Sequence, residues 1–289
     1  MRSTAHGLLI LAVCFFIPAA AAASESDALP FRLTPQGAII VPVAINGSRP
    51  VSFLLDTGSN GSVVSERLAA SLGLRAVAKT TMVSTSEQKG ALVARIGHLT
   101  LGTVGASDVL AALAPAEALS LPDTAALGCR VEGVIGQDVL GRLRYTIDYR
   151  ARRIHWRASS ADPPRRASRF ALEPQDDRFL IRLPQEHREL RLVPDTGSEA
   201  LVLFQPAETM AERARTDPAV ALTGLAGTRS AWRAVVRKLH VGDTILTELP
   251  AVVVDSKAGP TTVDGLLPLH FFARVTFDGP ERQLFIEPR

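Results

Sequence analysis

Cysteine and aromatic residues are scarce in this chain of 289 residues. It has 2 cysteines, Cys14 and Cys129, and 5% aromatic residues. After residue 23, no apolar run reaches the roughly 20 residues that a membrane-spanning helix needs. We therefore expect neither a small scaffold held by disulfides nor a membrane-spanning protein. The chain is 46% hydrophobic and 21% charged, which is the composition of a globular protein with a sizeable core.

The first 23 residues differ from the rest of the chain. Arg2 supplies a positive charge, an apolar run extends from Leu8 to Ile17, and Pro18 is followed by small residues that end at Ala23. This order predicts a secretory signal peptide, so we expect the protein to be exported, either to the periplasm or out of the cell. A membrane anchor is the alternative, but the apolar run is too short for one.

Removal of the signal peptide would also remove Cys14 and leave Cys129 as a lone cysteine. A lone cysteine cannot form an internal disulfide, and its apolar neighbours favour a small, buried hydrophobic residue over a catalytic thiol. A lipid anchor at Cys14 is disfavoured because the apolar run continues past it. We expect no stable insertion into a membrane after the signal is removed.

Several catalytic classes lack their motifs. The six histidines show no H-E-x-x-H or paired spacing, and the chain has no G-x-S-x-G elbow and no phosphate loop. We therefore expect no metal and no cofactor. The net charge is +3, and loss of Arg2 with the signal would lower it by one. Clustered arginines at 142–157 and 163–166 are interpreted as a solvated edge and a linker, and no nucleic-acid partner is expected.

The sequence Asp-Thr-Gly-Ser occurs twice, at Asp56–Ser59 and Asp195–Ser198, each time after an apolar run. Both flanks also share alternating strands, a tight glycine turn, an apolar pair and a closing hairpin, which indicates an internal repeat of mainly β units. The clearest helix pattern runs from Ser65 to Leu74, with Ser65 as its N-cap. We predict a signal peptide over residues 1–23, an N-terminal lobe over 24–157, a linker over 158–168 and a C-terminal lobe over 169–289.

Two aspartates in equivalent loops suggest a shared active site. Two carboxylates brought together cannot both ionise cheaply, so they share one proton and supply an acid beside a base. A water molecule between them could then attack a peptide carbonyl without a metal or a covalent intermediate. The neighbours support such a pair: Thr57 and Thr196 by hydrogen bonds across the interface, Gly58 and Gly197 by close backbone approach, and Ser59 and Ser198 by donation to the outer carboxylate oxygens.

The motifs "LLDTGS" and "VPDTGS", each followed downstream by an apolar pair ("VIG" and "LLP"), resemble those of aspartic proteases of the pepsin and retropepsin superfamily. The pattern resembles the compact retropepsin-like proteins of bacteria more than pepsins, with two such units fused in one chain. The resemblance implies a bilobal acid-protease fold, two similar β-barrel lobes with short helices, and a cleft between them that holds a peptide or protein substrate.

By that resemblance, Asp56 and Asp195 are the catalytic pair of an exported aspartic endopeptidase. The flap over the substrate is the hairpin around residues 83–92, and a second flap is expected at 223–232. Because both lobes lie in one chain, a monomer is sufficient for catalysis. The flap residues predicted to contact substrate are Ser84, Thr85, Ser86 and Gly90.

The sequence departs from the superfamily pattern in three places. Pro268 stands where the second lobe should match Gly136, Pro194 precedes the second aspartate inside a strand, and the flap tyrosine is missing. These departures keep an alternative open, a catalytically weak or inactive protease-like protein that binds peptides.

Overall fold

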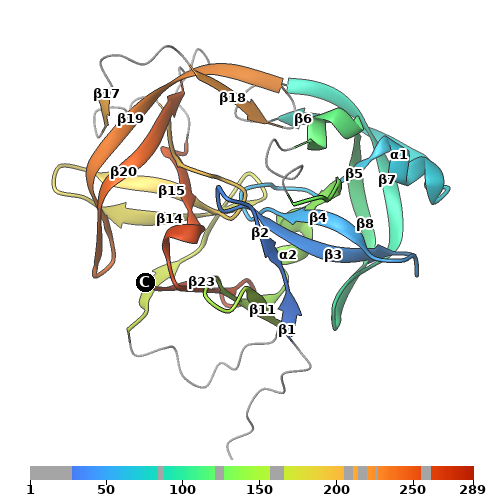
Figure 1. The fold of residues 1–289 in the computed structure, drawn as a ribbon, viewed down its shortest axis with the longest axis horizontal. Helices are drawn as coiled ribbons and strands as arrows, with labels where there is room; N and C mark the ends of the chain where they lie inside the picture. Colours follow the sequence, from blue (N-terminus) through green and yellow to red (C-terminus); the bar gives the residue numbers. More distant parts are fainter. Residues whose placement is uncertain are drawn as a thin grey trace, which may run out of the picture.

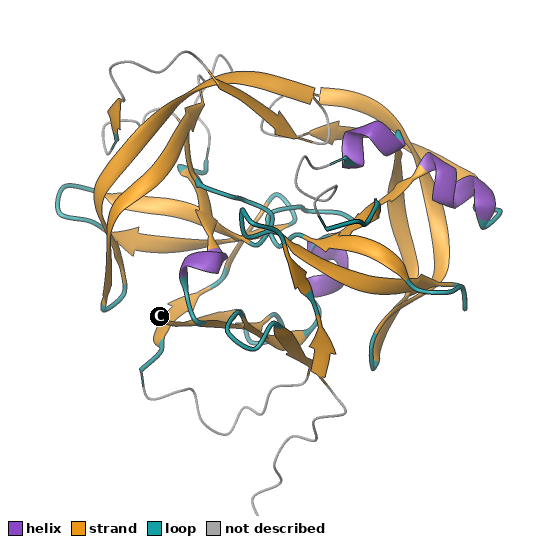
Figure 2. Cartoon of the chain, viewed as in Figure 1, coloured by secondary structure: helices purple, strands orange, loops and turns teal. Residues whose placement is uncertain are grey.

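The computed structural model describes residues 28–83, 88–120, 127–156, 166–204, 211–213, 220–224, 227–254 and 262–289. The predicted signal peptide and most of the predicted linker lie outside these residues. Strands dominate the described part, with a few short helices at the edges (Figure 2). The prediction of a mainly β fold with two similar lobes is confirmed. None of the described helices is long and apolar enough to cross a membrane.

The first lobe is built on an eight-stranded sheet, drawn in blue to green in Figure 1. Two of its strand pairs are parallel, β4 with β9 and β5 with β8, and the others are antiparallel. In spatial order its strands are β2 (Arg32–Leu33), β3 (Ile39–Ile45), β4 (Val51–Leu55), β9 (Val131–Ile135), β5 (Val63–Ser65), β8 (Val104–Ala114), β7 (Gln88–Leu101) and β6 (Ala76–Val83).

The second lobe repeats this plan in a nine-stranded sheet. Its parallel pairs are β15 with β21 and β16 with β20, as expected for a duplicated unit. In spatial order its strands are β13 (Glu173–Gln175), β14 (Arg178–Pro184), β15 (Glu189–Asp195), β21 (Gly265–Pro268), β16 (Leu201–Phe204), β20 (Thr244–Val254), β19 (Gly227–Val241) and β17 (Glu212–Arg213), with β18 (Val220–Gly224) also paired to β19.

A third, six-stranded sheet joins the two halves beneath the lobes (Figure 1). The sequence analysis assigned its strands to separate lobes, but β10 of the first half pairs directly with β22 of the second. The predicted linker ends at Ser168, which is the first residue of strand β12. In spatial order the strands are β1 (Ala28–Pro30), β11 (Arg153–Trp156), β10 (Arg144–Asp148), β22 (Arg274–Asp278), β23 (Gln283–Glu287) and β12 (Ser168–Ala171).

The contact between β10 and β22 combines packing with ion pairs. At its centre the hydroxyls of Thr146 and Thr276 are 2.8 Å apart. At its two ends Arg144 pairs with Asp278 at 3.0 Å and Arg274 pairs with Asp148 at 2.7 Å. Both aspartates are nearly buried, so these pairs are screened less than surface pairs. The shared sheet therefore holds the two lobes together at a specific register.

The helices are short. The predicted helix begins where expected: Ser65 Oγ accepts a hydrogen bond from the Leu68 N–H at 3.0 Å, and Gly73 beyond the helix has φ +65°. The helices are α1 (Glu66–Ser71) and α2 (Gln137–Leu140), with 3₁₀ turns η2 (Ala116–Leu119) and η4 (Leu269–Phe271). Cys129 is partly buried against apolar residues of the first lobe, close to the predicted environment.

The largest core cluster runs through both lobes and the shared sheet. Within a strand, side chains alternate between the two faces of the sheet, so some face the core and others face outward. In β3 the residues at both ends are fully buried, and Pro42 points outward. In the shared sheet, Tyr145 stacks on Phe277 with ring centroids 5.1 Å apart, and it also contacts Trp156. Aromatic pairs of this kind add to the burial energy, so the core fixes the lobes against each other.

Candidate active site

The two Asp-Thr-Gly-Ser loops leave equivalent strands and meet between the lobes. Asp56 directly follows β4, and its N–H donates to the Ile135 carbonyl of the neighbouring parallel strand β9 at 3.0 Å. Asp195 ends β15, where it lies opposite Pro268 of the parallel strand β21. Parallel neighbours thus fix each loop at the end of a buried strand, as the repeat in the sequence indicated.

The two threonines connect the loops through reciprocal hydrogen bonds. The Thr57 N–H donates to Thr196 Oγ1 at 3.0 Å, and the Thr196 N–H donates to Thr57 Oγ1 at 3.1 Å. Each hydroxyl then donates onward across the interface, Thr57 to the Pro194 carbonyl at 2.8 Å and Thr196 to the Leu55 carbonyl at 2.6 Å. Both threonines are at most 1% exposed, so these bonds are made without competition from water.

Each glycine lies against the aspartate of the opposite loop. A Cβ placed on Gly58 would come within 2.5 Å of the Asp195 carboxyl carbon. A Cβ placed on Gly197 would come within 2.9 Å of the Asp56 carboxyl carbon. These distances show that the two carboxyl groups face the same small space, and they explain why no larger residue fits at either glycine.

Backbone N–H groups hold each carboxyl group in place. Asp56 Oδ1 accepts hydrogen bonds from the N–H of Gly58 at 2.8 Å and of Ser59 at 3.1 Å. Asp195 Oδ1 accepts one from the N–H of Gly197 at 2.7 Å. Asp195 is 5% exposed, whereas Asp56 is only partly buried. The carboxyl groups are therefore fixed, but their environments differ.

The two serines do not behave as expected. We predicted that their hydroxyls would donate to the outer carboxylate oxygens. Instead, Ser59 Oγ donates to the Gly61 carbonyl at 2.9 Å, and Ser198 Oγ donates to the Ala200 carbonyl at 2.8 Å. A hydroxyl has one proton to donate, and the tight turn after each Asp-Thr-Gly leaves a nearby carbonyl to receive it. The serine hydroxyls therefore stabilise the loops rather than the carboxylate charge.

Burial and mutual repulsion shape the titration of the pair. Burial raises the pKa of Asp195 well above its ordinary value, and the adjacent Asp56 carboxylate raises it further. Burial also raises the pKa of Asp56, but a hydrogen bond from Asp195 and the backbone donors oppose that rise. The shared proton therefore resides on Asp195, and Asp56 is the group that ionises first.

This titration gives a stability prediction. Because the folded-state pKa of Asp195 is raised above the unfolded value, the folded state binds the extra proton, and stability falls as pH rises from about 4 toward that raised pKa. We expect Asp195→Asn, which carries no charge, to be more stable than the wild type at neutral pH. The advantage should grow with pH by about 1 kcal/mol per pH unit in that range. Urea unfolding of both proteins between pH 4 and 7 measures it; an advantage that shrinks with rising pH would contradict this assignment.

The close contact at Gly58 gives a second prediction. Gly58→Ala should reduce substrate turnover by about 10- to 100-fold, because the added methyl group would displace the Asp195 carboxyl group. Gly61→Ala is the matched control, since a Cβ there meets nothing within 4 Å. Steady-state cleavage assays on both variants measure the effect. Equal activity in the two variants would show that the carboxyl groups do not occupy the observed positions.

The two unusual prolines are accommodated without breaking the site. The antiparallel pairing of β14 with β15 ends at Leu192, two residues before Pro194, so the missing N–H of that proline costs no ladder bond with β14. The Pro194 carbonyl still accepts the hydroxyl of Thr57. Pro268 ends β21 and directly precedes the short η4 turn, where the first lobe has Gly136 and α2. The first lobe needs that glycine because a Cβ on it would come within 2.6 Å of Gly61.

Sequence reasoning missed one polar side chain behind the first loop. Gln137 Nε2 donates to the Thr57 carbonyl at 2.9 Å, and the Gln137 N–H donates to the Ser59 carbonyl at 2.9 Å. The signal was available, since Gln137 directly follows the apolar pair and Gly136. Its meaning depended on knowing that β9 ends beside the aspartate loop.

The two predicted flaps are long hairpins on the same side of the molecule, at the top of Figure 1. The first consists of β6 and β7, in which Gly90 pairs with Thr81 and is exposed. Ser84, Thr85 and Ser86 lie outside the described residues. The second consists of β18 and β19, which pair as far as Gly224 and Gly227.

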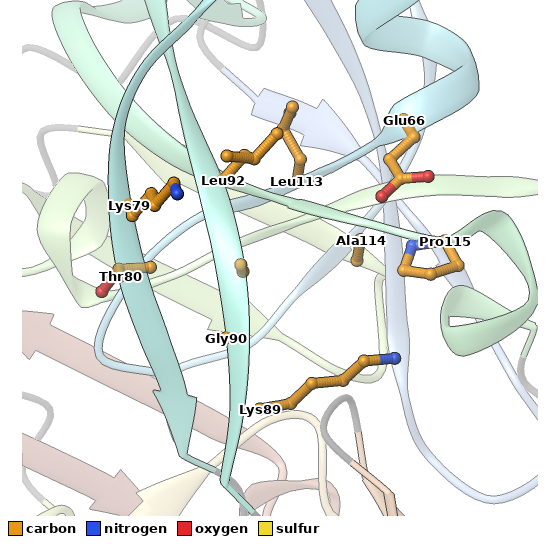
Figure 3. Close-up of a pocket in the computed structure, with 10 residues that line it drawn as sticks. Glu66, Lys79, Thr80, Lys89, Gly90, Leu92, Leu113, Ala114 and Pro115 are labelled. Atoms are coloured by element: carbon orange, nitrogen blue, oxygen red, sulfur yellow. The ribbon is translucent and has the colours of Figure 1, made fainter.

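A pocket of about 450 Å³ lies beside the first hairpin, between β6, β7 and the end of β8 (Figure 3). Its wall includes Leu92 and Leu113, and Lys89 extends from the hairpin toward Pro115. The carboxylate of Glu66 points toward the same region. The pocket thus combines apolar surface with two lysines, Lys79 and Lys89, and one carboxylate, Glu66, which suits an amphipathic side chain.

Among the described residues, no group of three or more His, Cys, Asp or Glu side chains could hold a metal ion. A family model described as aspartyl protease matches residues 41–139 and 185–271, one segment in each lobe. Each segment contains one of the two aspartate loops. A search of the curated proteins found no match.

Proposed function

Because the chain belongs to the aspartyl protease family, we propose that it is an endopeptidase that hydrolyses peptide bonds with water activated between Asp56 and Asp195. The observation that carries this proposal is the reciprocal placement of Gly58 against Asp195 and Gly197 against Asp56, which brings both carboxyl groups to one space. The family supports a protease-like function; the mechanism follows from the residues.

The unequal titration of the pair assigns the two roles. Asp56, the group that ionises first, takes a proton from the attacking water. Asp195, which holds the shared proton, donates it to the carbonyl oxygen of the substrate as the tetrahedral intermediate forms. Collapse of the intermediate breaks the C–N bond: the proton gained by Asp56 passes to the leaving nitrogen, and a hydroxyl of the diol returns its proton to Asp195 as the new carboxyl group forms. The pair returns to its starting state with one proton.

The substrate is a peptide or protein segment in extended form between the lobes and under the hairpins. The exposed edges of such hairpins can bind an extended peptide through main-chain hydrogen bonds. The pocket beside β6 and β7 would take one side chain of that peptide. Both aspartate loops belong to one chain, which supports catalysis by a monomer.

The order of features in residues 1–23 supports export to the periplasm or the cell exterior as part of this proposal. The alternative, a protein that binds peptides without cleaving them, rested on Pro194 and Pro268. The site geometry weakens it, because Pro194 lies beyond the β14 ladder and its carbonyl still accepts the hydroxyl of Thr57.

The test is cleavage of an unfolded protein, such as denatured casein, by the purified protein from acid to neutral pH. We expect new peptide termini to appear, and a peptide carrying a hydroxyl group that mimics the tetrahedral intermediate to inhibit their formation competitively. Tight binding of that mimic without any cleavage across the pH range would replace the endopeptidase with the peptide-binding alternative.

A further inference from the structure

His270 lies behind the second aspartate loop and is not accounted for by the chemistry above. Its imidazole is hydrogen-bonded to the backbone of Ser198, three residues after Asp195. This bond favours the charged form of the imidazole, so the ring N–H donates and the Ser198 carbonyl accepts. The backbone N–H of Ser198 hydrogen-bonds to Asp195 and so stabilises its carboxylate. Ser198 therefore links the imidazole of His270 to the carboxyl group of Asp195.

The first lobe has a different side chain at the equivalent position. The parallel pairing places Pro268 beside Asp195, just as Gly136 follows the strand beside Asp56, so His270 corresponds to Asp138. Asp138 accepts the Ser62 hydroxyl at 2.8 Å and so ties down the far end of the first loop. Both lobes thus use this position to hold the aspartate loop, but only the second lobe uses a group that titrates as an imidazole.

The ring also connects the two lobes. Gly37, in the turn between β2 and β3 of the first lobe, lies so close that a Cβ there would come within 2.4 Å of the His270 ring. The ring also contacts the ring of the adjacent Phe271, with ring centroids 4.6 Å apart. The Arg289 side chain donates to the His270 carbonyl at 2.5 Å. The imidazole is therefore confined by the Gly37 turn and Phe271, and the backbone of His270 is held by Arg289.

We propose that His270 is a positioning residue for the second aspartate loop, where its neutral imidazole holds the Ser198 carbonyl and braces the loop against the Gly37 turn of the first lobe. This inference rests on the proposed endopeptidase function. His270 does not touch the reacting atoms; it acts through Ser198 on the orientation of Asp195 toward Asp56.

The surroundings of the ring make this role sensitive to acid. Burial, together with the positive charge of Arg289, lowers the pKa of His270 from its ordinary 6.5 to about 4, although the bond to Ser198 opposes this shift. The other titratable groups near this site are Asp195, which holds a proton, and Tyr149, which burial keeps neutral. The turn at residues 34–37 carries no titratable side chain. Below pH 4 the imidazole becomes a buried cation beside Arg289. Because burial and this repulsion outweigh the bond to Ser198, as the lowered pKa shows, the brace loosens.

The experiment compares His270→Leu, which removes the donor, with His270→Gln, which keeps one. At pH 6 we expect His270→Leu to lower kcat by about 10-fold or more with KM nearly unchanged, and His270→Gln to recover most of the loss. The ratio of the His270→Gln rate to the wild-type rate should rise as pH falls through 4. His98→Gln, at an exposed histidine of the first lobe, is the matched control and should leave this ratio constant.

A substitution from the opposite lobe tests the brace without altering the imidazole. Gly37→Ala should reproduce the loss of kcat, whereas Gly47→Ala should not. Both glycines have positive φ, but a Cβ at Gly47 meets nothing within 4 Å. Wild-type kcat in His270→Leu, or a pH-independent rate ratio for His270→Gln, would overturn the proposal.

An NMR titration separates this proposal from the endopeptidase function. The imidazole Cε1–H signal of His270 in the full chain should titrate with a midpoint near pH 4, whether or not the protein cleaves peptides. A midpoint near 6.5 would refute the buried, braced imidazole. Absence of cleavage with a midpoint near 4 would refute the endopeptidase alone.

Discussion

Replacing Asp195 with asparagine should reduce peptide cleavage by about 10²- to 10⁴-fold, which is the usual contribution of a positioned acid or base. The amide has nearly the same shape as the carboxyl group and can still accept the Gly197 N–H. It cannot carry the shared proton to the substrate carbonyl. Asp56→Asn should cause a loss of the same order, because it removes the base that activates water. The double variant should be little worse than either single one, since the pair acts as a unit.

The measurement is kcat/KM on a fluorogenic peptide at the optimal pH, with thermal unfolding to show that each variant is folded. Asp243→Asn is the matched control, because Asp243 is an exposed turn residue of the second lobe. Binding of the hydroxyl-bearing mimic should persist in both dyad variants, although more weakly. More than a tenth of wild-type activity in either variant would exclude a shared dyad.

The second large effect concerns the bonds between the loops. Thr196→Val should destabilise the protein by about 2–5 kcal/mol. Valine has the shape of threonine but neither accepts the Thr57 N–H nor donates to the Leu55 carbonyl, so both of these buried groups lose a partner. Cleavage should fall as well, because the two aspartate loops would no longer be held in register.

Chemical unfolding of the wild type, Thr196→Val and Thr196→Ser measures this effect. Serine keeps the hydroxyl and should lose about 1 kcal/mol, mostly from the removed methyl group. If valine and serine destabilise equally, the hydroxyl bonds contribute little and the loops are held by packing alone.

The aspartate loops could be predicted from the sequence because their chemistry is local. Within four residues, each motif contains the acid, the threonine for the partner loop and the glycine that admits the opposite carboxyl group. The repeat then indicated that the two motifs meet. The mainly β, two-lobed fold followed from the same repeat together with alternating apolar residues.

The remaining features depend on contacts between distant segments. The shared six-stranded sheet was missed because a closing hairpin has the same pattern whether its edge pairs within its own lobe or with the other half. The serine hydroxyls were misassigned because the choice between a carboxylate and a turn carbonyl is decided by backbone geometry. His270 was unassigned because neither Ser198 nor Gly37 is near it in sequence.

The pairing of β10 with β22 has the form of a contact between copies. The strands read Arg-Tyr-Thr-Ile-Asp and Arg-Val-Thr-Phe-Asp, and the arginine of each faces the aspartate of the other around the central threonine pair. This is a pseudo-twofold axis, the arrangement by which two identical subunits form an isologous dimer.

In a true homodimer, the two subunits have the same sequence, so every position carries the same residue on both sides of the axis. Covalent linkage removes that constraint, and this chain differs on the two sides: Asp138 is matched by His270, and Gly136 by Pro268. The two aspartates accordingly lie in unequal environments, with Asp195 buried and Asp56 only partly buried, an inequality that one sequence used twice could not specify.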